Sequence, residues 1–174
     1  MKIKNEKIIC IVPAFNEQGK IGLQIKRLIS ANIFDLVLVV NDGPDDNTER
    51  EAKEPGALVI SNIKNLGFGR SIIIGLKYSI KNNFTIGRII SADLQHDPKD
   101  FHNMLNFLLE NKTDMVTGSR FGKGGEIVNA PIVRVLMTRL YAVIYSFMVF
   151  KYLKDPSNGM RIFLLSKFDD LNLN

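Results

Sequence analysis

The sequence contains a single cysteine, no signal-peptide pattern and no long uncharged apolar run. Cys10 cannot form a disulfide within the chain, so nothing marks an oxidising compartment. The N-terminal stretch MKIKNEKIICIV lacks both a sufficiently long apolar core and a small-residue cleavage site. No run reaches the roughly 18 uncharged apolar residues of a membrane-spanning helix. The nearest, residues 140–150, is too short and follows Arg139. We therefore expect no disulfide, no secretion signal and no membrane-spanning helix in this sequence.

A strong excess of one charge is also absent. Lysine and arginine number 23 and aspartate and glutamate number 18, which leaves a formal charge of +5. This mild excess suits an acidic small molecule, an anionic membrane surface or nucleic acid, and equally a solvated surface with a few additional lysines. With 45% hydrophobic and 24% charged residues, the 174-residue chain is expected to form one globular domain, and a disordered chain is excluded.

Short apolar runs alternate with longer amphipathic stretches. The runs predicted as strands are residues 8–12, 36–40, 57–61, 88–91 and 115–118. The stretches predicted as helices are residues 17–31, 48–53, 68–82 and 98–111. The first two strands are apolar on both faces, which suits a sheet covered on both sides. The alternating order predicts an α/β fold with a mostly parallel, Rossmann-like sheet and helices on both faces, in a single domain over residues 1–174.

The character of the sequence changes at Pro131. The segment PIVRVLMTRLYAVIYSFMVFKYL is long and apolar, and four basic residues lie within it or directly after it: Arg134, Arg139, Lys151 and Lys154. The segment is typical either of a core helix whose basic side chains extend to solvent, or of a helix that lies at a membrane surface or against a partner helix. The chain ends soon after another apolar run, residues 160–165, which predicts that a C-terminal part is missing.

Clusters of candidate site residues follow four of the five predicted strands. In strand order they are Pro13, Asn16 and Glu17; Asn41, Asp42 and Gly43; Asp93 and Gln95; and Gly118, Ser119 and Arg120. In open α/β sheets, ligands bind outside the carboxyl ends of the strands. Because four such clusters are more than strand–helix connections require, the sequence predicts a binding site at this edge of the sheet.

Some of these residues also suit a purely structural role. Asp46 or Asn47 suits the cap of a short helix, and Asp97 before Pro98 is typical of an N-cap followed by the first helical residue. His96 has no second histidine or cysteine at ligand spacing, which argues against zinc. Asp93 is different, because it precedes the cap and has no capping role there.

Several well-known nucleotide and hydrolase motifs are missing. Gly67-Phe68-Gly69 is followed three residues later by Ile72, so it does not match the dinucleotide fingerprint. No G-x-x-x-x-G-K-[ST] loop occurs, and neither G-x-S-x-G nor a Ser/His/Asp order is present. The sequence therefore disfavours a Rossmann dehydrogenase and excludes a P-loop nucleotidase, and it gives no support to a serine hydrolase.

Six segments together resemble a known family. IVPAFNE, VLVVNDGPDDNT, NLGFGRSIIIGLKYS, SADLQHDP, TGSRF and DPSNGMRIF occur in the order and spacing of the family 2 glycosyltransferases of the GT-A fold, over roughly residues 8–163. ADLQHDP and NGMR are similar to the polyprenyl-phosphate branch in particular, which is dolichol-phosphate mannose synthase-like. The resemblance implies an inverting, metal-dependent hexosyltransferase. It would move a sugar from a nucleotide-diphosphate sugar to a polyprenyl (dolichyl or undecaprenyl) phosphate.

The resemblance also implies roles for single residues. Asp93 and Gln95 would bind Mg²⁺ or Mn²⁺, and Asp93, Arg120 and Arg161 would be the catalytic residues around the donor diphosphate. The residues implied to bind the substrates are Pro13, Ala14, Asn16, Glu17, Asn41, Asp42, Gly43, Asn65, Gly67, Ala92, Gln95, Arg134 and Asp155. Two positions depart from the family pattern, since Asn41 and Ser91 each stand where it usually has an aspartate. Mg²⁺ is often held by one or two carboxylates plus substrate phosphates, so Asp93 alone is expected to suffice.

An anionic acceptor changes what the site must supply. A phosphate oxygen is already charged at pH 7, so it needs cations for positioning where a hydroxyl needs a general base. The basic, apolar segment from Pro131 suits a phosphate head with a hydrocarbon tail. The resemblance thus implies no nucleic-acid partner and a location on the cytoplasmic side of a membrane, peripheral or anchored by a part outside this sequence.

Two alternatives stay open from the sequence. One is a family 2 enzyme that acts on a saccharide hydroxyl, for which Asp155 is the natural base. The other is a degenerate nucleotide-binding scaffold, which the missing carboxylates at Asn41 and Ser91 favour.

Overall fold

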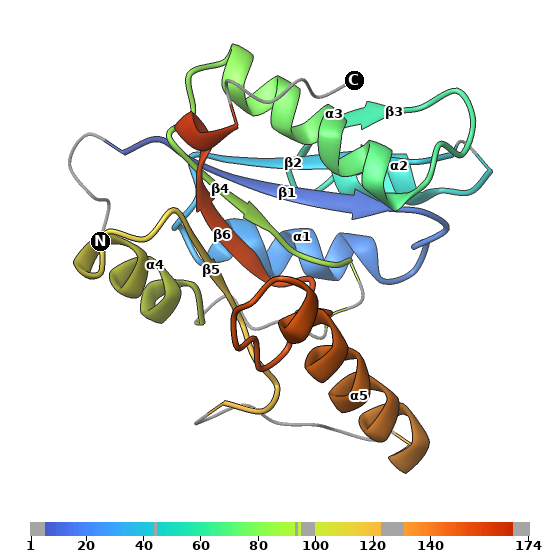
Figure 1. The fold of residues 1–174 in the computed structure, drawn as a ribbon. Helices are drawn as coiled ribbons and strands as arrows, with labels where there is room; N and C mark the ends of the chain where they lie inside the picture. The colour runs from blue at the N-terminus through green and yellow to red at the C-terminus, as the bar shows by residue number, and fades with distance from the viewer. Residues whose placement is uncertain (1–5, 44, 93, 95–99, 123–130, 169–174) are drawn as a thin grey trace.

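The computed structural model describes residues 6–43, 45–92, 94, 100–122 and 131–168. In chain order the elements are β1 (Ile8–Ala14), α1 (Ile21–Ser30), β2 (Leu36–Asn41), α2 (Thr48–Lys53), β3 (Leu58–Ser61), α3 (Phe68–Lys81), β4 (Ile86–Ile89), α4 (Asp100–Glu110), β5 (Met115–Thr117), α5 (Ile132–Met148), β6 (Arg161–Leu164) and the 3₁₀ turn η1 (Leu165–Lys167). The predicted α/β architecture is confirmed (Figure 1).

The six strands of the described ranges form one sheet in the order β3-β2-β1-β4-β6-β5. The pairs β1–β2, β2–β3 and β1–β4 are parallel, whereas β6 runs antiparallel to β4 and β5. From β1 the chain proceeds outward to β2 and β3, and then returns to place β4 on the other side of β1. The carboxyl ends of β1 and β4 therefore form a topological switch point, where open α/β sheets bind their ligands.

Helices cover both faces of the sheet (Figure 1). Every residue of β1 is buried, because its side chains alternate between two apolar clusters. Cys10 and Val12 pack with α1, while Ile9 and Ile11 pack with α3. A third cluster joins α4 to β4 and β6 through Phe101. The expectation that the first strands are buried on both sides is confirmed.

Among the element boundaries that differ from the predicted ones, two bear on the candidate site. Helix α1 begins at Ile21 and not at Glu17, because Asn16 (φ 54°) and Gly19 (φ 83°) adopt left-handed backbone conformations that a helix does not tolerate. Strand β4 ends at Ile89 and not at Ser91. Both differences lengthen the loops at the carboxyl edge of the sheet, where the candidate site lies.

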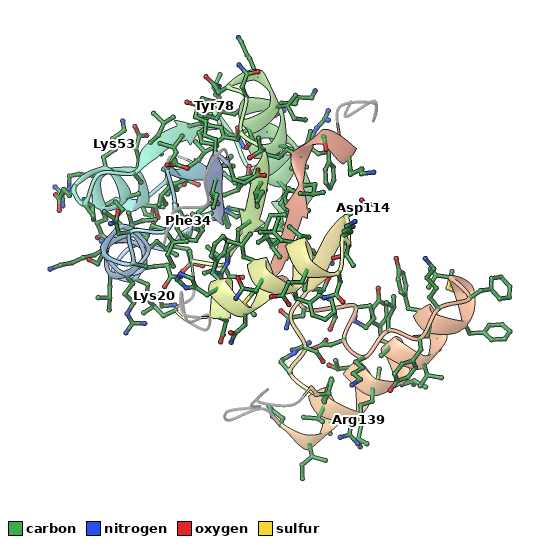
Figure 2. The ribbon with its side chains drawn as sticks, turned by 90° about the vertical axis from the view of Figure 1, so that its left-hand side faces the viewer. Lys20, Phe34, Lys53, Tyr78, Asp114 and Arg139 are labelled. Atoms are coloured by element: carbon green, nitrogen blue, oxygen red, sulfur yellow. The ribbon has the colours of Figure 1, made fainter. Side chains whose placement is uncertain are left out.

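Helix α5 projects from the body of the protein, so the interpretation of this segment as a core helix is wrong (Figures 1 and 2). Among the described side chains of α5, only Ala142 is buried. Ile132 and Phe147 are 78% and 79% exposed, and Phe150, just beyond the helix, is 90% exposed. None of the helices in the described ranges has the length and apolar character that crossing a bilayer requires.

Candidate active site

The carboxyl ends of β1, β2 and β3 meet at one edge of the sheet. The strand register places Ala14 beside Asn41, and Asn41 beside Ser61. Asp42 follows directly, and its backbone N–H donates to the carbonyl oxygen of Ala14 (2.8 Å). The residues predicted at the ends of the first two strands are thereby brought together.

Asp42 is buried and orders the loop between β3 and α3. Its Oδ1 accepts hydrogen bonds from Asn62 Nδ2 (2.7 Å) and from the backbone N–H of Leu66 (2.9 Å), and its Oδ2 accepts one from the N–H of Gly67 (2.8 Å). Burial alone raises the pKa of Asp42, but these hydrogen bonds and one from Ser71 outweigh it and hold the pKa below its usual value. Asp42 is thus ionised at neutral pH, and it fixes the segment that contains the predicted residues Asn65 and Gly67. Its contact with a nucleotide base stays a prediction.

Asn41 is fully buried, and neither its Nδ2 nor its Oδ1 has a hydrogen-bonding partner among the residues that the structure describes. On β2 it lies on the same side as Val37 and Val39, which pack against α1. A carboxylate buried at such a position without a partner costs more free energy than a neutral amide does. This burial favours a neutral amide over a carboxylate at position 41.

The loop that carries Asn16 and Glu17 is held by side chains that lie before or within α2. Three consecutive backbone N–H groups, those of Glu17, Gln18 and Gly19, donate to Thr48 Oγ1, Asp46 Oδ2 and Glu51 Oε2 respectively (2.9, 3.1 and 2.7 Å). Gln18 Oε1 in turn accepts from the N–H of Asn47 (3.1 Å). We did not predict Thr48 or Glu51 as site residues from the sequence, and Asp46 was predicted only as a cap. The cap position itself is Asn47, whose side chain forms no capping hydrogen bond, while Asp46 Oδ1 accepts from the N–H of Thr48 (2.9 Å).

The carboxyl ends of β4 and β5 meet the start of β6. Arg161, the first residue of β6, lies opposite Ile89 of β4 and opposite Thr117 of β5. The Gly118 N–H donates to the carbonyl oxygen of Met160 (2.9 Å), which continues the pairing beyond the strands. The Oγ of Ser91 lies 3.8 Å from where a Cβ on Gly159 would be. Ser91 after β4 and the predicted residues after β5 therefore lie around the loop that precedes β6.

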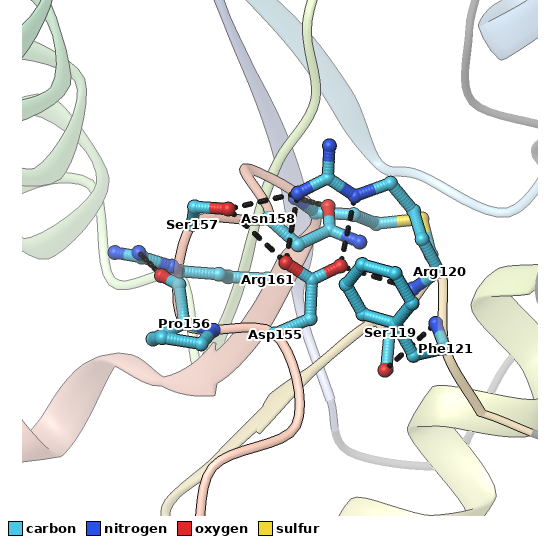
Figure 3. Close-up of polar contacts among 9 residues, drawn as sticks. Ser119, Arg120, Phe121, Asp155, Pro156, Ser157, Asn158 and Arg161 are labelled. Atoms are coloured by element: carbon cyan, nitrogen blue, oxygen red, sulfur yellow. Dashed lines mark hydrogen bonds and ion pairs between the residues drawn. The ribbon is translucent and has the colours of Figure 1, made fainter. Parts of the chain in front are cut away.

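An ion pair between Arg120 and Asp155 occupies the centre of this second half (Figure 3). Asp155 Oδ2 accepts from Arg120 Nε (2.8 Å) and from its backbone N–H (3.1 Å), and Oδ1 accepts from Arg120 Nη2 (2.8 Å). Burial raises the pKa of Asp155, but hydrogen bonds from Arg120 and Ser157 outweigh it and hold that pKa below its usual value. The hydrogen bond to Asp155 raises the pKa of Arg120. Both groups are therefore charged at neutral pH.

Arg161 lies beside this pair on the other side of the loop (Figure 3). Its Nη2 donates a long hydrogen bond to the carbonyl oxygen of Pro156 (3.4 Å), and its buried Nε has no partner within the described ranges. The residue as a whole is half-buried. It retains donors that a phosphate group can use.

Some predicted site residues cannot be placed. Asp93 and Gln95, like His96 and Asp97, lie outside the described residues. Arg134 lies in α5, but its side chain is also outside the described part. Ala92, which directly precedes Asp93, is buried.

The chemistry of the donor set around β4 fits a hard divalent cation. The described residues contain no group of three histidine, cysteine or acidic residues that could hold a metal by themselves. Ser91, Asp93 and Gln95 bring a hydroxyl, a carboxylate and an amide oxygen. Oxygen donors with one carboxylate suit Mg²⁺ or Mn²⁺ when substrate phosphates complete the coordination.

The architecture is the GT-A glycosyltransferase fold, as predicted. The chain aligns with mannosyl-3-phosphoglycerate synthase from Rubrobacter xylanophilus at a TM-score of 0.73 and 20% identity, over 94% of this chain and 55% of that one. It also aligns with glucosyl-3-phosphoglycerate synthase from Mycobacterium tuberculosis in complex with Mn²⁺, UDP and glucosyl-3-phosphoglycerate. That TM-score is 0.66 at 22% identity, over 93% of this chain and 58% of the other. These likenesses show the fold alone.

Residues 9–171 match the family described as glycosyl transferase family 2, and the chain belongs to this family. An uncharacterized protein of Methanocaldococcus jannaschii is 33% identical over 93% of this chain and 66% of its own length. UDP-N-acetylglucosamine–dolichyl-phosphate N-acetylglucosaminyltransferase of Methanococcus voltae is 27% identical over 90% of this chain and 68% of its own length. Undecaprenyl-phosphate mannosyltransferase of Micrococcus luteus is 27% identical over 90% of this chain and 66% of its own length. The chain thus spans about two thirds of the length of these relatives.

Proposed function

We propose that this chain is the catalytic domain of an inverting glycosyltransferase that moves a hexose from a nucleotide-diphosphate sugar to a polyprenyl phosphate. The observation that carries the proposal is the buried ion pair of Asp155, the base candidate identified from the sequence, with Arg120. Its side chain is 0% exposed, and both oxygens accept hydrogen bonds from Arg120. The site thus offers an acceptor a fixed cation, which suits an anionic acceptor better than a hydroxyl. The names of two family relatives, which act on dolichyl and undecaprenyl phosphates, support the same acceptor class.

The donor side requires stabilisation of the leaving diphosphate. Arg161 supplies a guanidinium group whose remaining donors can form charge-assisted hydrogen bonds with phosphate oxygens. Asp93, with Gln95 and the hydroxyl of Ser91, would hold Mg²⁺ or Mn²⁺, which neutralises charge on the diphosphate when bound. Exchange of Asp93 for asparagine is expected to abolish transfer while leaving the unfolding temperature unchanged. Near-normal activity in that variant would remove Asp93 from the metal role.

The transfer itself is a single displacement. An oxygen of the acceptor phosphate forms a bond to the anomeric carbon while the bond from that carbon to the donor diphosphate breaks on the opposite face. The configuration at the anomeric carbon is thereby inverted. No proton has to be removed from the acceptor, because its phosphate is ionised at pH 7. An occupied Asp155 is compatible with this chemistry, whereas attack by a saccharide hydroxyl requires a free base.

The exposed helix α5 suits an anionic membrane surface, where a polyprenyl phosphate resides. Its apolar side chains are exposed around most of the helix, and residues 127–154 contain four basic and no acidic residues. The rings of Tyr141 and Tyr145 stack with centroids 5.7 Å apart, and aromatic side chains favour the interface between water and lipid. We therefore place the protein on the cytoplasmic leaflet, with α5 in contact with the lipid.

The membrane contact can be measured with vesicles. Each basic residue near an anionic surface contributes about 1 kcal/mol to binding, which corresponds to roughly a fivefold change in affinity. Lys151→Ala is expected to weaken binding to phosphatidylserine-containing vesicles by about this factor, and Phe150→Ser is expected to weaken binding to neutral vesicles as well. Lys77→Ala, which alters an exposed lysine of α3, is the matched control. Equal binding by all four proteins would refute the placement of α5.

A transfer assay tests the proposed function. The full-length protein is incubated with labelled nucleotide sugars, Mg²⁺ or Mn²⁺, and one of three acceptors: a polyprenyl phosphate, the matching unphosphorylated polyprenol, or an oligosaccharide. Product with the phosphate alone supports the proposal. Product with the oligosaccharide alone identifies the saccharide-acting alternative. Calorimetry without metal-dependent binding of a nucleoside diphosphate identifies a scaffold.

A further inference from the structure

The carboxylate of Asp155 is committed to its neighbours on both oxygens. Within the described ranges, Arg120 contributes Nε, Nη2 and its backbone N–H, and the Ser157 hydroxyl donates to Oδ1 (3.1 Å). Ser157 Oγ also accepts from Arg120 Nη2 (2.8 Å). Since Nε and Nη2 bond to different oxygens, the guanidinium and the carboxylate form a planar fork that fixes the rotation of both groups.

One edge of the Arg120 guanidinium remains available. Its Nη1 forms no hydrogen bond with any residue that the structure describes, and it points away from Asp155 in Figure 3. The Arg120 side chain is 34% exposed, whereas that of Asp155 is 0% exposed. The pair thus has a buried anionic side and a partly exposed cationic side.

We propose that Asp155 is a positioning residue, which holds Arg120 so that Nη1 is presented to the phosphate of the acceptor. The proposal rests on the proposed function for the identity of that anion. Asp155 also fixes the backbone of residue 120, and the nearby Gly118 N–H bonds to Met160. Side chain and main chain are therefore held by the same carboxylate, and Asp155 itself takes no part in proton transfer.

A double-mutant cycle separates this role from that of a base. Misplacement of a binding group by about 1 Å costs on the order of 10²-fold in rate, so Asp155→Asn is expected to raise the acceptor KM by about 10- to 100-fold. The donor KM should stay within about twofold. In an Arg120→Ala background, Asp155→Asn should cost no more than about twofold, because the group through which it acts is gone. The acceptor KM of Ser157→Ala is expected to lie between that of Asp155→Asn and that of the unaltered protein.

The controls keep the outcome interpretable. Asp114→Asn removes an exposed carboxylate that pairs with Lys167 at the far end of β5 and should change neither KM. Thermal unfolding of every variant identifies those that fail to fold. The positioning role would be overturned if Asp155→Asn raised the acceptor KM in the Arg120→Ala background by as much as it does in the otherwise unaltered protein. It would also be overturned if Asp155→Asn alone left the acceptor KM unchanged.

A second measurement does not depend on sugar transfer. The Nε–H of Arg120 should give a slowly exchanging signal in a proton–nitrogen NMR spectrum, and Asp155→Asn should abolish its protection. A short, water-soluble prenyl phosphate added to the unaltered protein should shift this signal at a concentration at least about tenfold lower than in Asp155→Asn. A shift without any sugar transfer would sink the proposed function and retain the positioning role. No protection in the unaltered protein would overturn the positioning role whatever the transfer assay shows.

Discussion

Replacing Asp42 by asparagine tests how the loop between β3 and α3 is ordered. The amide keeps one acceptor oxygen, so it can still accept from Asn62 and Leu66 but turns N–H donors toward the N–H of Gly67. A hydrogen bond to a charged group contributes about 1.5–3 kcal/mol, and a buried group left without a partner costs about 1–3 kcal/mol. We expect Asp42→Asn to lower the free energy of unfolding by about 2–4 kcal/mol. For a chain of this length that corresponds to a drop of roughly 5–15 °C in Tm.

The same variant has a defined dependence on pH. The folded pKa of Asp42 lies below its usual value, so the carboxylate contributes fully to stability above the unfolded pKa of about 3.9. This contribution is lost as the pH falls through the folded pKa. The difference in unfolding free energy between the two proteins should therefore be constant from about pH 8 to pH 5 and shrink below about pH 4.

Urea unfolding across this pH range gives the free energies, and hydrogen exchange reads the loop directly. The amides of Leu66 and Gly67 should exchange faster in Asp42→Asn, while those of β1 should not change. Asp114→Asn is the matched control, since an exposed ion pair contributes at most about 1 kcal/mol. A difference below about 0.5 kcal/mol at pH 7, together with unchanged exchange at both amides, would refute the reasoning.

Three further variants test other contacts. Asn41→Asp places a carboxylate at a fully buried position that has no partner in the described part of the chain. The pKa of this carboxyl should be raised in the folded state, so the loss of stability should grow as the pH rises above about 4 and reach about 3 kcal/mol or more in urea unfolding. Gly75→Ala adds a Cβ that would lie 2.5 Å from Ile11 Cγ2; a loss of about 1–3 kcal/mol is expected by the same measurement, and a loss under 0.5 would contradict the close packing of α3 on β1. Thr48→Val removes the acceptor of the Glu17 N–H; the donor KM should rise about tenfold, with the acceptor KM unchanged, in steady-state kinetics.

The strands were predictable because uninterrupted apolar runs in the local sequence indicate their burial. Residues 8–12 and 36–40 are apolar at every position, which only a sheet covered on both faces explains. The start of α1 was predicted too early, because the left-handed conformations of Asn16 and Gly19 depend on hydrogen bonds from the loop to α2. The exposure of α5 could not be derived, since apolar composition does not say what a helix packs against.

The candidate site was predictable to the extent that its residues follow strands. The proximity of Asn41 and Asp42 to Ala14 follows from parallel pairing alone. The pairing of Arg120 with Asp155 joins residues 35 positions apart, and neither sequence segment contains a sign of the other. Thr48 and Glu51 were missed for a related reason: both residue types are common in the first turn of any helix, and only the folded structure shows that they reach the adjacent loop.

The antiparallel strand β6 has a consequence for how this fold can vary. The chain leaves the sheet after β5 and returns at β6, and the ion pair 35 residues apart joins the two ends of that excursion. The free-energy cost of closing a loop grows only slowly with its length, by roughly 0.6 kcal/mol per doubling. The excursion that contains α5 can therefore be lengthened, shortened or exchanged at little cost to the sheet.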